Sequence, residues 1–176
     1  MKIINLVFLG LISFVFNAAA QEISASKVPG QTSFYAELGG PGVLFSANID
    51  RRFNKSHLGI GGRAGIGFVS GYFDNSVNKN GLPKSIVTLP IQINYLFGKN
   101  NSSHTFEVGA GVTYVGQKVD LLNFEGTNRS QVFGTASFMY RRQPMNGGFS
   151  WRVGFTPLIA NGYIQPFVGS SVGFTF

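Results

Sequence analysis

A two-residue period of apolar side chains is the feature that most restricts the fold of this chain. The period is clearest over residues 86–97, and it returns over 105–115 and 164–176. Successive side chains of a β-strand point to opposite faces, so this period predicts strands with one apolar face. In the first segment that face consists of Val87, Leu89, Ile91, Ile93, Tyr95 and Phe97. None of these three apolar faces contains a charged residue.

Weaker alternation marks five further segments, which brings the prediction to eight strands. They are 33–40, 43–53, 58–73, 130–142 and 149–158. Eight antiparallel strands are the smallest number commonly used to close a membrane barrel. Short turns are predicted at 54–57, 98–103 and 143–148, and long loops at 74–84 and 117–128. The connections at 39–42 and 160–162 lie on the side of the long loops but are themselves short.

The second face of these strands separates a membrane barrel from a soluble one. Charged residues make up 12% of the chain, about half the roughly 25% that is usual in soluble domains. The second face holds mostly Gly, Ser, Thr, Asn and Gln, which suit a narrow lumen better than a solvated surface. A Lys or Arg facing lipid at mid-depth costs about 2–4 kcal/mol, which explains the uncharged face. The chain is therefore predicted to be all-β, an eight-stranded antiparallel up-and-down transmembrane β-barrel; a soluble β-barrel is the alternative.

Aromatic residues gather at the strand ends that border the short turns. Membrane barrels carry such girdles where the wall meets the two interfaces. The predicted members are Phe34, Phe53, Tyr95, Phe97, Phe106, Tyr140, Phe149, Trp151 and Phe176. The opposite girdle is thinner, with Tyr72, Tyr114 and Tyr163.

The N-terminus has the order of a secretory signal peptide. Lys2 is followed by an apolar run over 3–16 and by Ala18, Ala19 and Ala20 ahead of Gln21. The run is too short to span a bilayer comfortably, although an anchoring helix is the alternative. We therefore predict a cleaved signal at 1–20, a flexible lead-in at 21–32 and a barrel at 33–176. The absence of Cys excludes disulfides and a lipid anchor on Cys. The formal charge of +7 is not read as nucleic-acid binding, because an exported chain meets none and its basic residues are scattered.

The last nine residues end in Phe176, with apolar residues alternating back from it through Phe174 and Val172. This ending looks like the terminal-strand signal by which bacterial outer-membrane barrels are recognised and inserted. Residues 33–176 resemble small outer-membrane β-barrel domains without a known activity, and 35–40 followed by 48–53 looks like the opening of such barrels. The resemblance implies the outer membrane as location, contact with its lipid and lipopolysaccharide, and the barrel assembly machinery as a transient partner. It carries over no catalytic residue.

Four charged residues are predicted to point into the lumen from alternate strands: Glu37, Arg63, Glu107 and Arg152. Two acids and two bases can neutralise one another, whereas each alone would be costly to bury. Asp50, Arg52 and Arg141 are candidates to extend this network toward the short turns. The interpretation is a polar plug that orders a narrow lumen. A binding or conduction site is the alternative.

Catalytic chemistry has little support in the sequence. Outer-membrane lipid-modifying enzymes and proteases generally need a His beside a Ser or an acid. The two histidines, His57 and His104, are predicted to be solvated residues of short turns, and they make a poor metal site. We expect no cofactor, no metal site and no nucleic-acid partner, and we expect a monomer. The leading hypothesis is a non-enzymatic envelope barrel, structural or interacting through its outer loops; a lipid-modifying enzyme and a narrow pore are the alternatives.

Overall fold

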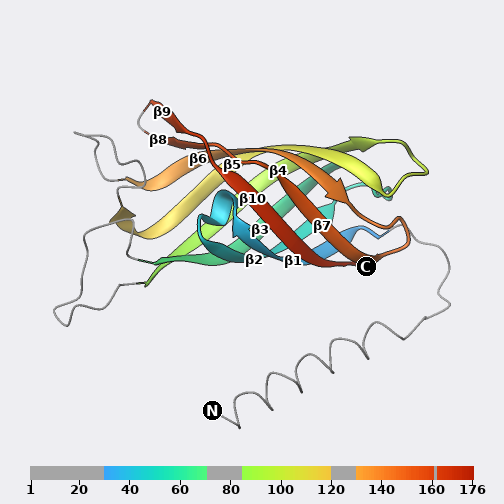
Figure 1. Ribbon diagram of the computed structural model, residues 1–176, viewed down its shortest axis with the longest axis horizontal. Helices are drawn as coiled ribbons and strands as arrows, with labels where there is room; N and C mark the ends of the chain where they lie inside the picture. Colours follow the sequence, from blue (N-terminus) through green and yellow to red (C-terminus); the bar gives the residue numbers. More distant parts are fainter. Residues whose placement is uncertain (1–29, 71–84, 120–129, 161) are drawn as a thin grey trace, which may run out of the picture.

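The computed structural model describes residues 30–70, 85–119, 130–160 and 162–176, which form a closed β-barrel (Figure 1). Its elements are β1 (Thr32–Gly39), η1 (Gly40–Gly42), β2 (Phe45–Arg52), β3 (Gly59–Ser70), β4 (Ser85–Gly98), β5 (His104–Val119), β6 (Ser130–Arg142), β7 (Gly148–Phe155), β8 (Leu158–Ala160), β9 (Tyr163–Gln165) and β10 (Val168–Thr175). Within these residues, no helix is long and apolar enough to cross a membrane. The predicted signal at 1–20, most of the lead-in at 21–32 and the loop at 74–84 lie outside the described residues, as do residues 120–128 of the loop at 117–128.

All barrel strands are antiparallel, and most pair with their neighbours in sequence. The two ends of the chain close the barrel, because β1 pairs with β10 from Ser33↔Thr175 to Gly39↔Gly169. The side-chain hydroxyls of Ser33 and Thr175 lie 2.8 Å apart across this seam. The terminal end of the barrel is the one that holds Thr32 and Phe176, and the opposite end is the loop end.

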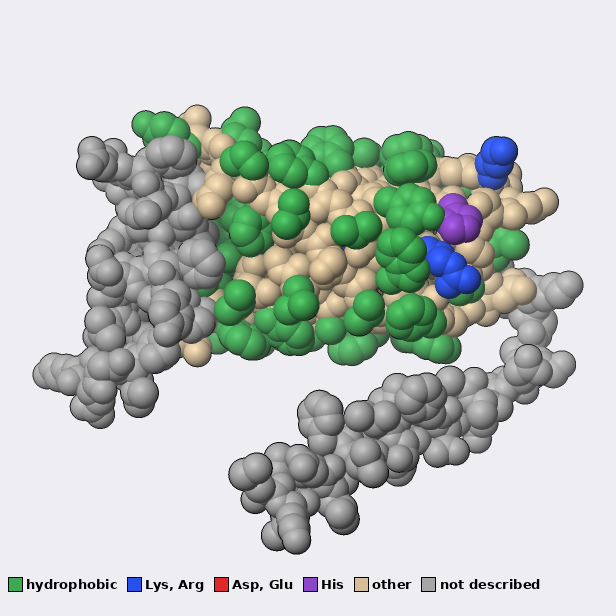
Figure 2. Space-filling view, in the orientation of Figure 1, with side chains coloured by type: hydrophobic (Ala, Val, Ile, Leu, Met, Phe, Trp, Pro, Cys, Tyr) green, Lys and Arg blue, Asp and Glu red, His purple; other side chains and the backbone are tan. Residues whose placement is uncertain are grey.

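The two faces of the wall follow the period in the sequence. Along β4 exposed and buried residues alternate from Ser85 to Leu96. Ile91 is 58% exposed, whereas its neighbour Gln92 is 2% exposed. Since the apolar side chains point outward and the polar ones inward, the molecule is inside-out relative to a soluble barrel. Figure 2 shows hydrophobic side chains spread over the outside of the barrel wall.

Two prolines divide the last two predicted strands. The segment predicted as 149–158 is β7 and β8, separated by Thr156 and Pro157, and the segment 164–176 contains β9 and β10, separated by Pro166 and Phe167. Proline has no N–H to give to the ladder, and here the ladder breaks beside Pro157 and Pro166. Across the breaks the Thr156 N–H donates to the Phe167 carbonyl at 2.7 Å, and the Ala136 N–H donates to the Pro157 carbonyl at 3.1 Å. The prediction of eight barrel strands is correct, but two of them are interrupted.

The first connection differs from the prediction. Residues 39–42 were expected to be a short connection and 43–53 to form a strand; instead residues 40–43 fold into the lumen at the loop end, and β2 begins only at Phe45. Thr88 donates to the Gly42 carbonyl at 2.9 Å, and Thr113 donates to the Pro41 carbonyl at 2.8 Å. These bonds satisfy carbonyls that water cannot reach, which is why a loop can be buried here.

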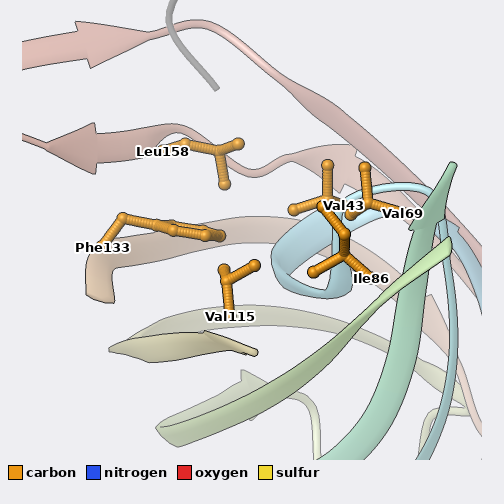
Figure 3. Close-up of a cluster of buried hydrophobic side chains, with 6 residues drawn as sticks. All are labelled: Val43, Val69, Ile86, Val115, Phe133 and Leu158. Carbon is orange, nitrogen blue, oxygen red and sulfur yellow. The ribbon is translucent and has the colours of Figure 1, made fainter. Parts of the chain in front are cut away.

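An apolar cluster surrounds this inward turn. Its members are Val43, Val69, Ile86, Val115, Phe133 and Leu158, each at most 3% exposed. Figure 3 shows Val43 beside the turn, with side chains from β3, β4, β5, β6 and β8 directed toward the same space. The lumen is therefore filled at its loop end by a small hydrophobic core.

Candidate functional site: a chain of charges across the lumen

Seven charged side chains form an alternating series across the lumen, from Arg63 to Arg52. Its order is Arg63, Glu37, Arg152, Glu107, Arg141, Asp50, Arg52. Each carboxylate contacts two guanidinium groups, and each of these side chains is at most 2% exposed. The four arginines exceed the three acids by one positive charge within the described lumen.

All the contacts are within ion-pair distance, and the one between Asp50 and Arg141 has the length of a charge-assisted hydrogen bond. Glu37 Oε1 lies 3.4 Å from Arg63 Nη1 and 3.2 Å from Arg152 Nη2. Glu107 Oε2 is 3.2 Å from both Arg152 Nη1 and Arg141 Nη1. Asp50 Oδ2 accepts from Arg141 Nη1 at 2.7 Å, and its other oxygen accepts from Arg52.

Neutral polar groups hold the arginines in place. The Arg152 guanidinium carbon lies 3.7 Å from the centre of the Tyr35 ring, an arrangement in which the aromatic face attracts the cation. Arg63 donates to the Tyr35 hydroxyl at 3.2 Å and also to Gln92. Asn94 accepts from Arg52 and donates to Asp50 at 3.1 Å. The series is thus fixed from several strands at once.

Glycines make the space that these side chains occupy. A Cβ added at Gly61 would lie 2.3 Å from the Arg52 guanidinium carbon, and one at Gly109 would lie 2.5 Å from the Ser137 hydroxyl. An eight-stranded barrel has an interior just wide enough for side chains, so small residues must alternate with large ones. The Gly-rich face that the sequence shows is the space in which the arginines lie.

Burying ions costs desolvation free energy, and in this site the attraction between paired ions offsets that cost. Each ion loses several kcal/mol of hydration when it enters a low-dielectric interior, and mutual attraction compensates only with close geometry and further hydrogen bonds. Each acid here has two cationic partners, and several arginines have neutral acceptors as well. The arrangement can hold the strands in register and block the lumen.

The structure brings together the four predicted lumen residues, Glu37, Arg63, Glu107 and Arg152, and it joins to them Asp50, Arg52 and Arg141 as the suggested extension. Sequence reasoning missed Tyr35, Gln92 and Asn94 as their partners. The strand period does contain that signal, because each of the three lies on the inward face of its strand.

The two histidines lie at the terminal end, as predicted; His104 is exposed as expected, although it begins a strand, whereas His57 is buried and not solvated. His57 lies in the turn after β2 and is only 6% exposed, and burial lowers the pKa of its imidazole below its ordinary value. His104 is the first residue of β5, and its Nδ1 is hydrogen-bonded to the Tyr140 hydroxyl. Among the described residues, no group of three or more His, Cys, Asp or Glu side chains is arranged to hold a metal.

Two solved structures share this fold. The N-terminal β-barrel domain of OprF from Pseudomonas aeruginosa superposes with a TM-score of 0.56 at 12% identity, covering 86% of this chain and all (100%) of that domain. The backbone structure of the outer-membrane protein Ail from Yersinia pestis, determined in a phospholipid bilayer nanodisc, superposes with a TM-score of 0.51 at 14% identity, covering 84% of this chain and 99% of Ail. No protein-family model matches the chain, and no curated protein sequence is similar to it.

These likenesses define the class of the molecule. A closed antiparallel barrel of eight strands, apolar outside and polar inside, has the fold of the small outer-membrane β-barrels. The predicted fold class and the predicted resemblance are both confirmed.

Proposed function

We propose that the protein is a non-enzymatic outer-membrane barrel with a sealed lumen, which serves as a rigid envelope scaffold and interacts through its outer loops. The observation that carries this proposal is the filling of the lumen, by the charged series in one part and by the apolar cluster around η1 in another. A wall that is uncharged outside and a lumen packed with side chains suit anchoring better than transport.

The orientation follows from the lengths of the connections. In this class, short turns face the periplasm and longer loops face outward. The terminal end has the short turns after β2, β4 and β6, while the segments 71–84 and 120–129 join strands at the loop end. Contacts with partners would then be made by the loops predicted at 74–84 and 117–128, of which 117–119 belong to β5, since function concentrates on loops carried by a rigid scaffold. The strand that ends at Val172, Phe174 and Phe176 would be the signal for the assembly machinery.

A lipid-modifying enzyme of the outer rim would need an acid, a hydroxyl and a His near the loop end. Both histidines lie at the terminal end instead. This placement supports the non-enzymatic proposal.

The proposal is tested in two measurements on the full-length protein. Outer-membrane fractionation and heat-dependent migration in detergent gels should both be positive, and a soluble protein that shows neither would contradict the membrane location. In planar bilayers the folded barrel should give a current equal to that of empty lipid. Steady single-channel steps, absent with heat-unfolded protein, would refute the sealed lumen.

A further inference from the structure

Four cations outside the lumen, all with described side chains, lie at the terminal end of the barrel. Glu37, Asp50 and Glu107 are the described acidic side chains, and all three are buried in the lumen. Outside the lumen, the cations whose side chains the structure describes are Arg51, Lys55, Lys99 and Arg142, and these four lie at the terminal end; β5 also contains Lys118, near the loop end. Figure 2 shows a histidine and Lys or Arg side chains at this end, beside the last hydrophobic side chains of the wall. Apart from the terminal carboxylate of Phe176, the described residues place no acid there.

Arg142 has the most structured surroundings of these cations. It is the cross-strand partner of His104 on β5 and of Trp151 on β7. Beside it runs a row of aromatic rings: Phe106 and Tyr140 have their centres 5.7 Å apart, and Tyr140 and Trp151 5.4 Å apart. A guanidinium and an imidazole thus lie at the same level as rings that favour a membrane interface.

An apolar hollow of about 520 Å³ opens on the neighbouring strands. Phe149, Trp151 and Val153 on β7 line it, with Val172 on β10 and Ala36 and Leu38 on β1. Trp151 therefore belongs both to the surroundings of Arg142 and to the lining of the hollow. The floor is low because Ala36 and Ser170 are small, so the hollow can take a chain that lies along the wall.

We propose that this face binds one anionic glycerophospholipid, with its phosphate against Arg142 and His104 and an acyl chain in the hollow beside Trp151. The proposal rests on the membrane location proposed above, and it adds a specific lipid site to it. A guanidinium binds phosphate through two parallel hydrogen bonds. A zwitterionic lipid offers the same phosphate, but its own ammonium cancels the charge. The site therefore selects a lipid with net negative charge in the leaflet that faces the terminal end.

Trp151 is the one tryptophan of the chain, so its fluorescence reports on lipid at this position. The purified full-length barrel is inserted into vesicles of phosphatidylcholine and phosphatidylglycerol in equal parts, with bromine on the acyl chains of either one lipid or the other. We expect the quenching of Trp151 to show phosphatidylglycerol enriched about fivefold over phosphatidylcholine beside this residue. One surface cation gives an enrichment of this size. The preference should fall to unity in Arg142→Gln and decrease in His104→Gln, and it should weaken at high salt.

Arg51→Gln is the matched control, because it removes the same charge at the same end from β2. It should keep the preference. Equal quenching by both brominated lipids in the unmodified protein would overturn the lipid site while leaving the membrane location intact; quenching by neither would overturn the membrane location itself. A preference lost equally in Arg51→Gln and Arg142→Gln would show a diffuse positive rim and refute a defined site. Heat-dependent migration of each variant verifies that the barrel has folded.

Discussion

The charged part of the lumen and the apolar cluster at its loop end fill the same barrel by opposite means. In the charged part, seven ionised side chains alternate in sign, and each acid contacts two arginines. In the apolar part, six side chains and the turn η1 pack without any charge. The comparison shows that a barrel with an apolar outer wall can carry inside it a small core like that of a soluble protein.

The two parts differ in what a substitution leaves behind. Removing a carboxylate leaves buried cations with fewer ion pairs, and the free energy lost by their desolvation is then no longer offset. A missing methyl group leaves a void whose cost depends on how far its neighbours collapse. The charged part should therefore be the more sensitive of the two, and substitutions in each can test this.

The largest effect is expected for Glu107→Leu. This change removes one of the two carboxylates that Arg141 and Arg152 each contact, in a lumen that already has one surplus cation, so it should cost about 3–5 kcal/mol in the free energy of unfolding. Urea unfolding in lipid vesicles measures it. Combined with Arg152→Met, the loss should be smaller than the sum of the two single losses. An unfolding midpoint equal to that of the unmodified protein would mean that the network does not stabilise the barrel.

A slightly smaller effect is expected for Leu158→Ala in the apolar cluster, about 2–5 kcal/mol. The side chain is 3% exposed, so its removal opens a cavity beside Phe133 and Val43. Ile159→Ala is the matched control on the same strand, because Ile159 is 39% exposed on the outside and leaves no cavity. Equal losses for the two variants would show that the cluster is not packed as a core. The losses of Leu158→Ala and Glu107→Leu should add if the two parts are independent.

The smallest of the three effects, about 1–3 kcal/mol, is expected for Gly40→Ala, at the junction of the two parts. Gly40 has φ +71°, and a Cβ there would lie 2.7 Å from the Glu37 carboxyl carbon. The strain at this position therefore also displaces a member of the charged series. The same unfolding measurement should show coupling of Gly40→Ala with Glu107→Leu of more than about 0.5 kcal/mol. Strict additivity would place Gly40 in the apolar part alone.

The strand period was enough to predict the wall. Alternation placed Ile91 outside and Gln92 inside, and the same rule directed Glu37, Arg63, Glu107 and Arg152 inward. A two-residue period leaves each side chain only two directions, and an uncharged face decides between them. The inward direction of the charged side chains could be predicted from the uncharged outer face, since charges that cannot face lipid have to lie together in the lumen.

The turn η1 could not be predicted in the same way. The sequence at 39–42 is rich in glycine and contains a proline, which indicates a tight turn but not the side of the wall to which it folds. That direction depends on distant hydrogen bonds from Thr88 and Thr113. The prolines at 157 and 166 do carry a local signal for a strand break. His57 was wrongly expected to be solvated because the burial of a turn depends on the strands around it.

The seam between β1 and β10 has a consequence for the order in which the molecule is built. Ser33 and Thr175 are 142 positions apart along the chain, whereas most other strand pairs are hairpins of neighbours. Contacts between residues so distant in sequence form slowly, because closing the loop between them costs the chain conformational entropy before any bond forms. The ion pairs from Glu37 to Arg152 and from Asp50 to Arg141 join strands of the first half of the chain to strands of the second half. Closure should thus limit the rate of folding, and charge neutralisation inside the lumen should be completed in the same final step.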